Sequence, residues 1–307
     1  MDLCSYFVKD RALFGSFPTQ DSVKELEEHG VRYFVNLTLD SEKKITPYAT
    51  QYNYIHYPIV DNQIPTNWKS YAQFIIRISK IIFNLQKGEL LLIHCKGGHG
   101  RSGLVVASIL CHMFGITPED ALRRTTKYHS NRLVMRDKWR KIGSPQTRLQ
   151  KNLVYKFFEP LRFCRQYKTG YTTGFSNFSQ HSVCVPELGL FPTAEAAFQA
   201  HKNTADVDYV EKQKNARTPM FSNYIGNRCV PVEDWEEKKD MIMEMVIRLK
   251  IEQNEDIGSK LLNTGLRPLV EHNTRGDSYW GDGLDGKGMN KLGKILMKIR
   301  NEMYENM

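Results

Sequence analysis

The sequence predicts an α/β protein with two domains, and three observations support this fold class. Short apolar segments rich in β-branched residues alternate with amphipathic segments through the first half of the 307-residue chain. This alternation predicts a central sheet flanked by helices. It stops within residues 159–170, and beyond them helical patterns dominate, which predicts a mainly α-helical α+β domain. We therefore expect one domain over 1–162 and a second domain over 168–307.

The elements expected in the first half follow from local patterns. Alternating or fully apolar runs predict strands, whereas helix formers with apolar residues three and four positions apart predict helices. Thr117 followed by Pro118 marks one helix start, because Thr caps and Pro fits the first helical position. The expected strands are 12–18, 31–39, 52–59 and 89–94, and the expected helices are 21–29, 67–85, 104–114, 118–129 and 146–158.

The second half contains fewer strand patterns. A helix is expected directly after Thr193, and a long amphipathic helix is expected over 238–253. Residues 266–271 predict a strand, and a glycine-rich loop over 281–288 leads into a helix over 290–300. The buried face of the long helix is expected to consist of Met241, Met245, Ile247 and Leu249.

Composition narrows the class of protein. The chain is 41% hydrophobic and 25% charged, with no apolar run near the eighteen or so residues that span a bilayer. The first residues lack the apolar segment of a signal peptide. Six cysteines occur without CxxC pairs, so neither a disulfide framework nor a metal site is expected. A reactive thiol needs a reducing compartment, which favours the cytoplasm. Because there is no long apolar run, no membrane partner is expected.

Positive charge is concentrated in one window of the chain. The net charge is +9, but residues 121–168 hold fourteen Lys and Arg against Asp137 and Glu159. Most charged runs are simply solvated faces. A basic face beside an anion-binding loop, however, also fits a polyanionic partner such as a nucleotide or a nucleic acid.

The strongest functional signal is the segment from Gly88 to Phe114. An apolar strand pattern ends at His94, and an apolar helix pattern begins at Leu104. The loop between them, CKGGHGRS, contains Cys95, Lys96, Gly97, Gly98, His99, Gly100, Arg101 and Ser102. Its glycines permit a tight turn whose amides point inward, which makes an anion site at a helix N-terminus.

These residue types predict phosphoryl transfer. A thiol at a helix N-terminus is readily ionised, so we expect Cys95 to act as a thiolate nucleophile. Arg101 provides a planar fork for two phosphate oxygens, and Ser102 can donate to the leaving sulfur. Lys96 and His99 are expected to add positive charge for a highly anionic substrate. The alternative is a structural cysteine in a glycine-rich turn.

The loop HCKGGHGRSG resembles the signature loop of cysteine-based phosphatases of the dual-specificity type. The resemblance covers roughly the first half of the chain and implies a general-acid Asp on an earlier loop. Asp61 in HYPIVDNQIP matches that pattern, with Asp40 as the weaker competitor. Asp61 could also be an ordinary turn residue. The family positions the second-step water with a Gln in some members, for which Gln146 or Gln150 is a candidate.

In the second half, PTAEAAFQAHK places Glu195 in the first turn of a helix and Lys202 seven residues later. Seven residues return to the same helix face, about 10 Å further along the axis. That separation is too long for an intimate ion pair and long enough to bracket a small substrate. The alternative is a surface Glu and Lys without a role.

The ordered motifs GFSNF, FPTAEAAFQAHK, DSYWGDG and GKGMNKLGKILMKIR resemble the NADAR family over about 173–300. That family includes N-glycosidases of riboflavin synthesis and hydrolases that remove ADP-ribose from guanine bases. Ala196 is a departure, because members often carry His there.

The resemblance implies cleavage of an N-glycosidic bond, in which a carboxylate stabilises positive charge at the sugar C1 or activates water. Glu195 and Asp277 are the candidates. Trp235 and Trp280 are expected to stack on the base, and Arg228 to hold a phosphate. Lys202 could act as a cation or as a Schiff-base amine. The other expected substrate-binding residues are Asn177, Phe178, Gly281 and Asn290.

Together these features predict a bifunctional hydrolase that needs no cofactor. Its expected substrates are phosphorylated nucleotide, ribosyl or ADP-ribosyl compounds, with nucleic acid a further partner for the basic 121–168 face. The alternative is a protein phosphatase whose second half only binds ADP-ribose or a nucleotide.

Overall fold

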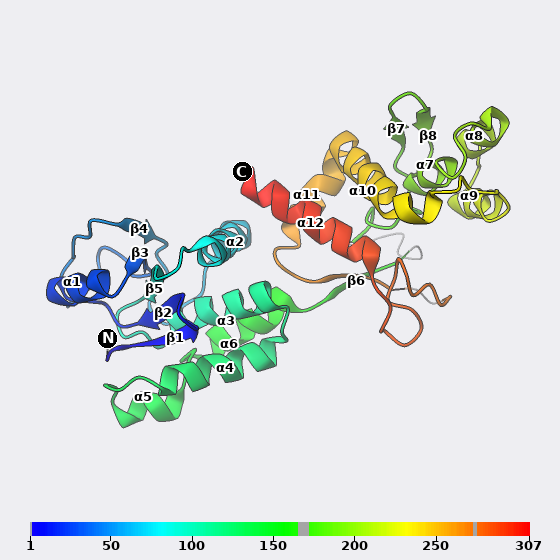
Figure 1. Ribbon diagram of the computed structural model, residues 1–307. Helices are drawn as coiled ribbons and strands as arrows, with labels where there is room; N and C mark the ends of the chain where they lie inside the picture. Colours follow the sequence, from blue (N-terminus) through cyan, green and yellow to red (C-terminus); the bar gives the residue numbers. More distant parts are fainter. Residues whose placement is uncertain (1, 165–171, 273–274) are drawn as a thin grey trace. The chain divides into compact units, whose positions relative to one another are not determined.

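The computed structural model describes residues 2–164, 172–272 and 275–307. The chain divides into two compact units, Met1–Glu159 and Pro160–Met307 (Figure 1). Part of the expected boundary, residues 165–170, lies outside the described residues. No helix in the described ranges is long and apolar enough to cross a membrane.

The first unit contains a five-stranded sheet in the order β1-β2-β5-β3-β4. The strand β1 is antiparallel to β2, and the other neighbours are parallel, so β2, β3, β4 and β5 end at the same edge. The strands are β1 (Cys4–Val8), β2 (Ala12–Gly15), β3 (Val31–Asn36), β4 (Asn53–His56) and β5 (Leu90–His94). The sheet was expected, but β1 was not.

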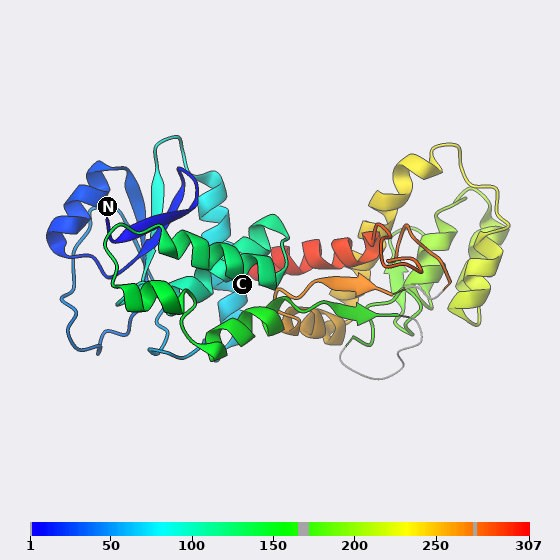
Figure 2. The same cartoon turned by 90° about the horizontal axis from the view of Figure 1, so that it is seen from below.

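Helices cover both faces of this sheet. Leu90 and Leu92 pack with Val23 and Leu26 of α1 in one apolar cluster, so alternation along β5 directs Leu91 and Ile93 to the opposite face. The helix α3 packs against β2 and β5, and contacts α2, α4 and α6 (Figure 1 and Figure 2). The helices are α1 (Gln20–Glu28), α2 (Trp68–Asn84), α3 (Arg101–Phe114), α4 (Pro118–Ser130), α5 (Asp137–Ile142) and α6 (Arg148–Phe158).

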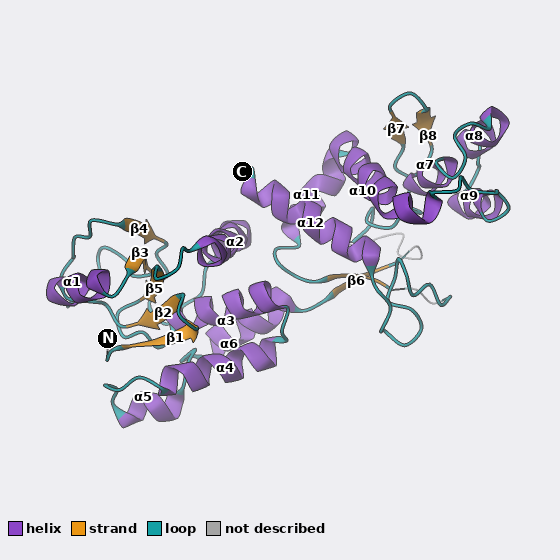
Figure 3. Ribbon diagram, viewed as in Figure 1, coloured by secondary structure: helices purple, strands orange, loops and turns teal. Residues whose placement is uncertain are grey.

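The second unit is mainly helical (Figure 3). Its helices are α7 (Ala194–Ala200), α8 (Val207–Lys214), α9 (Pro219–Gly226), α10 (Trp235–Gln253), α11 (Glu255–Asn263) and α12 (Lys291–Glu305). Two short strand pairs accompany them: β6 (Leu161–Phe163) parallel to β9 (Leu269–Glu271), and β7 (Val183–Val185) antiparallel to β8 (Gly189–Phe191). The mixed α/β fold class is therefore confirmed.

The buried face of α10 differs in part from the expected one. Met241 is 65% exposed, whereas Met243, Val246 and Ile251 are buried together with Ile247. The expectation was wrong for Met241 alone, because Ile247 is in the core and Met245 and Leu249 are partly buried against it. Methionines on two faces of this helix look alike in sequence, and only packing against the rest of the unit selects one face. The consequence is that Met243 faces the cavity described below.

Candidate active sites

The phosphate loop of the first unit begins where β5 ends. Cys95 follows His94 directly and is buried, with 3% of its surface exposed. Gly98 has a φ of 70°, and a Cβ there would collide with the carbonyl oxygen of Gly15. The backbone turn therefore requires glycine at 98, both for its conformation and for its contact with β2.

The loop presents unpaired donors. Within the described part of the chain, the amides of residues 96–101 donate to no protein acceptor, and no side chain caps α3 at Gly100. A row of free amides at a helix N-terminus attracts an anion. The Ser102 hydroxyl is fully buried beside this loop and, among the described residues, has no hydrogen-bond partner.

Arg101 is held by two acidic side chains and two carbonyls. Its guanidinium bonds both carboxylate oxygens of Glu42, with Nη2 3.1 Å from Oε2. Nη1 donates to the Ile59 carbonyl at 3.0 Å and to Leu37 at 3.4 Å. Burial opposes the charge of Arg101, yet its bonds to Glu42 and the charges of Cys95 and Asp61 raise its pKa. The guanidinium is therefore a fixed cation.

Asp61 lies at this same guanidinium. Its Oδ1 is 3.0 Å from Arg101 Nη2, although the Asp61 side chain is 59% exposed. Asp40, the weaker general-acid candidate, is 91% exposed and lies 3.8 Å from His56. The structure therefore brings Asp61, and not Asp40, to the ion-pair network of the phosphate loop.

Both glutamine candidates contact the Asp61 loop. Gln146 Nε2 donates to Asn62 Oδ1 at 2.8 Å, and Gln150 Nε2 donates to the Gln63 carbonyl at 3.3 Å. Gln150 is fully buried and would lie 3.0 Å from a Cβ on Gly100. Of the two, Gln150 therefore lies against the phosphate loop itself.

His99 does not add positive charge to the loop, contrary to expectation. Its Nδ1 lies 2.8 Å from His129 Nε2, and its ring stacks on Trp139 with centroids 4.7 Å apart. Burial, assisted by the charge of Arg132, lowers the pKa of His99 to about 4. His99 is therefore neutral near pH 7. The exposed Lys96, which donates to the Lys43 carbonyl at 2.8 Å, remains a cation of the loop.

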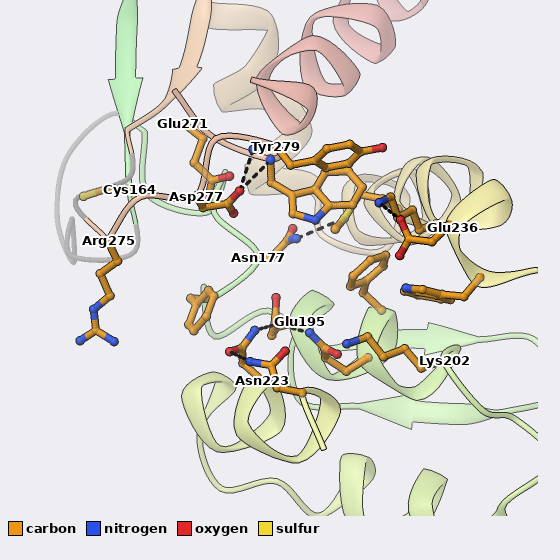
Figure 4. A pocket seen from close by; sticks show the side chains of 18 of the residues that line it. Cys164, Asn177, Glu195, Lys202, Asn223, Glu236, Glu271, Arg275, Asp277 and Tyr279 are labelled. Atoms are coloured by element: carbon orange, nitrogen blue, oxygen red, sulfur yellow. Dashed lines mark hydrogen bonds and ion pairs between the residues drawn. The ribbon is translucent and has the colours of Figure 1, made fainter. Parts of the chain in front are cut away.

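The second unit contains a cavity of about 520 Å³. Figure 4 shows Glu195, Lys202 and Asn223 on one wall and Glu271, Asp277 and Tyr279 on the facing wall. The predicted residues that line it are Asn177, Phe178, Glu195, Lys202, Trp235, Asp277 and Trp280. Within the described residues, no group of three acidic, His or Cys side chains is placed to hold a metal ion.

Glu195 is positioned by its helix start. Thr193 caps α7, and Glu195 is only 5% exposed in the first turn. Its Oε1 accepts hydrogen bonds from Gln199 Nε2 at 2.8 Å and from Asn223 Nδ2 at 2.9 Å. Burial nevertheless raises its pKa. This carboxyl group is therefore oriented by two amides and poised to take or give a proton.

Lys202 and the two tryptophans line the same cavity. Lys202 Nζ donates to the Gly226 carbonyl at 2.9 Å, and burial lowers its pKa, against the opposing effect of Glu195. Trp235 and Trp280 both pack on Phe198, with centroids at 5.1 Å and 5.5 Å. A lysine with a lowered pKa fits either of its two expected roles.

The facing wall contains a carboxylate that the sequence analysis missed. Glu271 ends β9, and burial, together with the charges of Asp277 and Glu195, raises its pKa to about 8. Asp277 is fixed by a turn in which its Oδ1 accepts from the amides of Tyr279 and Trp280, each at 3.0 Å. Glu195, Glu271 and Asp277 thus line one cavity, and burial raises the pKa of both glutamates.

Three predicted residues do not line this cavity. Arg228 is exposed and stacks on Tyr224 at 3.5 Å. Asn290 instead accepts from the Glu271 amide at 2.9 Å and donates to Leu269, so it ties β9 to the start of α12. Gly281 is buried, and its carbonyl accepts from the Asn290 amide. The lining cations that sequence reasoning missed are Lys239 and Arg275.

Comparisons with known proteins match each unit separately and the chain as a whole. Residues 1–153 match the family described as "Swiss Army Knife protein, DSP-PTPase phosphatase domain", and residues 162–304 match the NADAR domain. "Putative tyrosine phosphatase 197R" of Invertebrate iridescent virus 6 is 32% identical over 315 residues, covering 99% of this chain and 96% of that protein.

Two further similarities concern the second unit. "N-glycosidase YbiA" of Shigella flexneri serotype 5b (strain 8401) is 40% identical over 131 residues, covering 42% of this chain and 80% of that protein. The NMR structure of the E. coli protein YbiA is 35% identical and has a TM-score of 0.43. It covers 48% of this chain and 86% of that one.

Proposed function

The chain belongs to the family in which a phosphatase domain of the dual-specificity type precedes a NADAR domain, and we propose that it is a bifunctional hydrolase. The first unit removes a phosphate through Cys95. The second unit cleaves the N-glycosidic bond of a phosphorylated ribosyl or ADP-ribosyl nucleobase compound. Both reactions consume water, and neither requires a cofactor.

The phosphatase proposal is carried by the position of Cys95 inside a loop of unpaired amides beside a fixed guanidinium. The Cys95 sulfur attacks phosphorus and the bond to the leaving oxygen breaks, while Asp61 gives that oxygen a proton. Water then attacks phosphorus, the S–P bond breaks, and Asp61 takes the proton from the water. Ser102 donates to the departing sulfur, and Gln150 orients the water.

Arg101 and Glu42 work as a unit in this reaction. Glu42 holds one edge of the guanidinium with two bonds, and therefore fixes the direction in which the remaining N–H groups point. Charge on the equatorial phosphate oxygens is then stabilised by a group that does not have to reorganise during the reaction. Because His99 is neutral, it adds no positive charge to the phosphate site, and Arg101 is the cation that binds the phosphate oxygens.

The glycosidase proposal is carried by the facing carboxyl groups of the cavity. Cleavage of the C1–N bond leaves positive charge on the sugar and negative charge on the base. Glu195 and Asp277 stabilise the sugar or activate water, and Glu271, which holds a proton at neutral pH, supplies it to the departing nitrogen. The aromatic rings of Trp235 and Trp280 receive the base. Lys239 and Arg275, rather than Arg228, receive the phosphate.

Lys202 has two roles that chemistry can separate. As a cation it stabilises the departing base, whereas as a free amine it attacks the opened sugar aldehyde to form an imine and water. Borohydride reduces the imine to a stable amine that keeps the sugar on the chain, whereas reduction of the free aldehyde attaches nothing. Trapping of labelled sugar on the chain, lost in Lys202→Arg, therefore supports the amine role. Absence of trapping in an active preparation supports the cationic role.

The basic 121–168 face favours a substrate that is itself a nucleotide or is attached to nucleic acid. Its described charged side chains include the exposed Arg123, Lys138 and Lys141. Such contacts weaken steeply with salt. Binding of an ADP-ribosylated oligonucleotide that does not change between low and physiological salt would contradict this part of the proposal.

The decisive experiment separates the two activities in the full chain. Cys95→Ser and Glu195→Ala are incubated with an ADP-ribosylated guanine oligonucleotide and with a ribosylated aminopyrimidine phosphate. Inorganic phosphate and free base are then measured. We expect Cys95→Ser to abolish phosphate release alone and Glu195→Ala to abolish base release alone.

The exposed Cys184→Ser and Glu252→Ala variants are the matched controls and should change neither product. If base is never released but ADP-ribose binds in calorimetry, the second unit is a binding module. If a phosphotyrosine peptide is turned over faster than every nucleotide substrate, the first unit is an ordinary protein phosphatase.

A further inference from the structure

A second arginine lies behind the phosphate loop. Arg132 follows the C-terminus of α4 and is 3% exposed. Its Nη2 donates to the Phe14 carbonyl at 3.1 Å, and its guanidinium lies 4.5 Å from the centre of the Phe14 ring. Its Nε is buried with no acceptor among the described residues. The side chain is therefore held in place with part of its donor capacity unused.

No carboxylate neutralises this charge in the described part of the chain. Arg101 pairs with Glu42 and Asp61, but no described Asp or Glu lies within ion-pair distance of Arg132. Burial lowers the pKa of Arg132 only to about 10, so the group remains charged near neutral pH. An unpaired buried charge is costly, and a protein retains one where another charge compensates it.

The surroundings of Arg132 leave one candidate for that compensating charge. Cys4 on β1 is a neutral thiol, because burial raises its pKa. His99 in the loop and His129 on α4 are neutral as well, since burial lowers their pKa values to about 4 and about 3. Arg140 is cationic and donates to the Arg132 carbonyl at 3.1 Å. The remaining candidate for the charge that compensates Arg132 is the Cys95 sulfur.

The strand register places Cys95 close in the fold to Phe14, the residue that anchors Arg132. Phe14, whose carbonyl accepts from Arg132, pairs with Ile93 of β5, and Gly15 pairs with His94. Cys95 directly follows the end of β5, and Gly98 packs on Gly15. The pairing of β2 with β5 therefore brings the Cys95 segment close to the carbonyl that anchors Arg132. Burial lowers the pKa of Arg132, whereas the charges of Cys4 and Cys95 raise it.

We propose that Arg132 is a positioning residue for phosphoryl transfer, whose buried guanidinium serves as the fixed counter-charge of the Cys95 sulfur behind the phosphate loop. Arg101 binds phosphate from the substrate side, whereas Arg132 supports the nucleophile from the protein side. The anion at sulfur is stabilised before attack and again when the S–P bond breaks. This inference rests on Cys95 as the nucleophile, but its test needs no turnover.

The test measures alkylation of Cys95 by iodoacetamide as a function of pH, with each cysteine followed by peptide mass spectrometry. The neutral variant Arg132→Gln keeps an amide donor for the Phe14 carbonyl. We expect its alkylation midpoint to move to higher pH, so that alkylation at pH 6 is about tenfold slower than in the unsubstituted chain. Arg132→Lys, which keeps the charge, should restore most of the rate.

Arg32→Met is the matched control, because Arg32 also stacks on an aromatic ring, Tyr52, and donates to backbone carbonyls. It lies away from the phosphate loop, near the start of β3. The exposed Cys184 is an internal reference whose profile should not move. Circular dichroism identifies an unfolded variant, and Arg132→Met then provides the neutral comparison. Superimposed Cys95 profiles for the folded neutral variant and the unsubstituted chain would overturn the proposal.

If Cys95→Ser leaves phosphate release intact while the alkylation profiles shift as expected, the phosphatase proposal fails and the electrostatic pairing stands. If Cys95→Ser abolishes phosphate release and the alkylation profiles superimpose, the phosphatase proposal stands and the electrostatic pairing of Arg132 with Cys95 fails. The two outcomes are therefore distinguishable.

Discussion

The Oδ1 of Asp61 lies 3.0 Å from Nη2 of Arg101, a nitrogen that also donates to Glu42. Asp61 lies on a loop and Arg101 begins α3, forty positions later in the sequence. This pairing places the candidate acid beside the group that grips phosphate. It also means that a phosphate oxygen bound at Nη2 competes with the Asp61 carboxylate for the same donor.

Replacing Asp61 by Asn should lower the kcat of the phosphatase without raising its KM. The amide supplies no proton to the leaving oxygen, so kcat for an alkyl phosphate should fall about 10²- to 10⁴-fold. The loss should be smaller for p-nitrophenyl phosphate, whose leaving group needs less protonation. KM should stay the same or fall, because a neutral amide at this position competes less strongly than a carboxylate for Arg101.

Steady-state kinetics on both substrates measures this, with the exposed Asp40→Asn as control. A larger loss in the control would identify Asp40 as the acid.

Replacing Glu271 by Gln should make the stability of the second unit less dependent on pH. The folded state raises the pKa of Glu271 to about 8 from an ordinary 4.5. Between these values the unfolded chain has lost a proton that the folded chain keeps, so stability falls as pH rises through this window. Glutamine mimics the protonated form. The variant should therefore match the unsubstituted chain at pH 4.5 and exceed it at pH 8.

The expected gain at pH 8 is about 1–2 kcal/mol, or a few degrees in Tm, because Glu271 is partly exposed and its charge is partly screened. Thermal unfolding followed at both pH values measures it. Glu252→Gln, on the exposed face of α10, is the matched control. A gain in Glu271→Gln that is equal at the two pH values would contradict this account. Base release by the variant should nevertheless decline, since glutamine gives no proton.

Replacing Gly226 by Ala should impair the glycosidase alone. A Cβ at Gly226 would collide with Gln199 Oε1, and Gln199 donates to Glu195. The Gly226 carbonyl also accepts from Lys202, so both candidate catalytic groups shift together. We expect base release to fall at least about tenfold while phosphate release is unchanged.

Gly258→Ala is the matched control for this substitution. A Cβ at Gly258 would meet its nearest neighbouring atom, on the Met303 side chain, at 3.5 Å, which is an ordinary van der Waals contact. Both variants add one methyl group to a helix of the second unit, so only the collision with Gln199 distinguishes them. Equal rates of base release by the two variants would show that the contact of Gly226 with Gln199 does not affect the glycosidase.

The two family resemblances drawn from the motifs are confirmed, and so is the mixed α/β fold class. Both could be predicted because each depends on residues that are close in sequence. The strand, glycine-rich loop and helix around Cys95 are consecutive, and local conformation places their amides together. The Thr193 cap fixes Glu195 in the first turn of α7 in the same way. The roles of individual site residues stay predictions.

Other parts of the sites depend on segments that are distant in sequence. Glu42 occurs in an ordinary charged stretch, and nothing in its spacing indicates that it meets Arg101. Glu271 has the weak signal of an acid at the end of an apolar strand, but its raised pKa arises from burial and from Asp277 and Glu195 on other segments. Arg228 and Asn290 fit their motifs, yet packing directs them away from the cavity.

The sequence by itself therefore determined which chemical groups are available and where local geometry presents them: the thiol in its amide-lined loop and the carboxyl group at a helix start. Only the tertiary structure decided their charge states and their neighbouring groups. It made His99 neutral by burial beside His129, paired Asp61 with Arg101, and left Arg132 buried without a carboxylate among the described residues. The physical reason is that proton affinity depends on burial and on neighbouring charge, and both are set by contacts between distant segments.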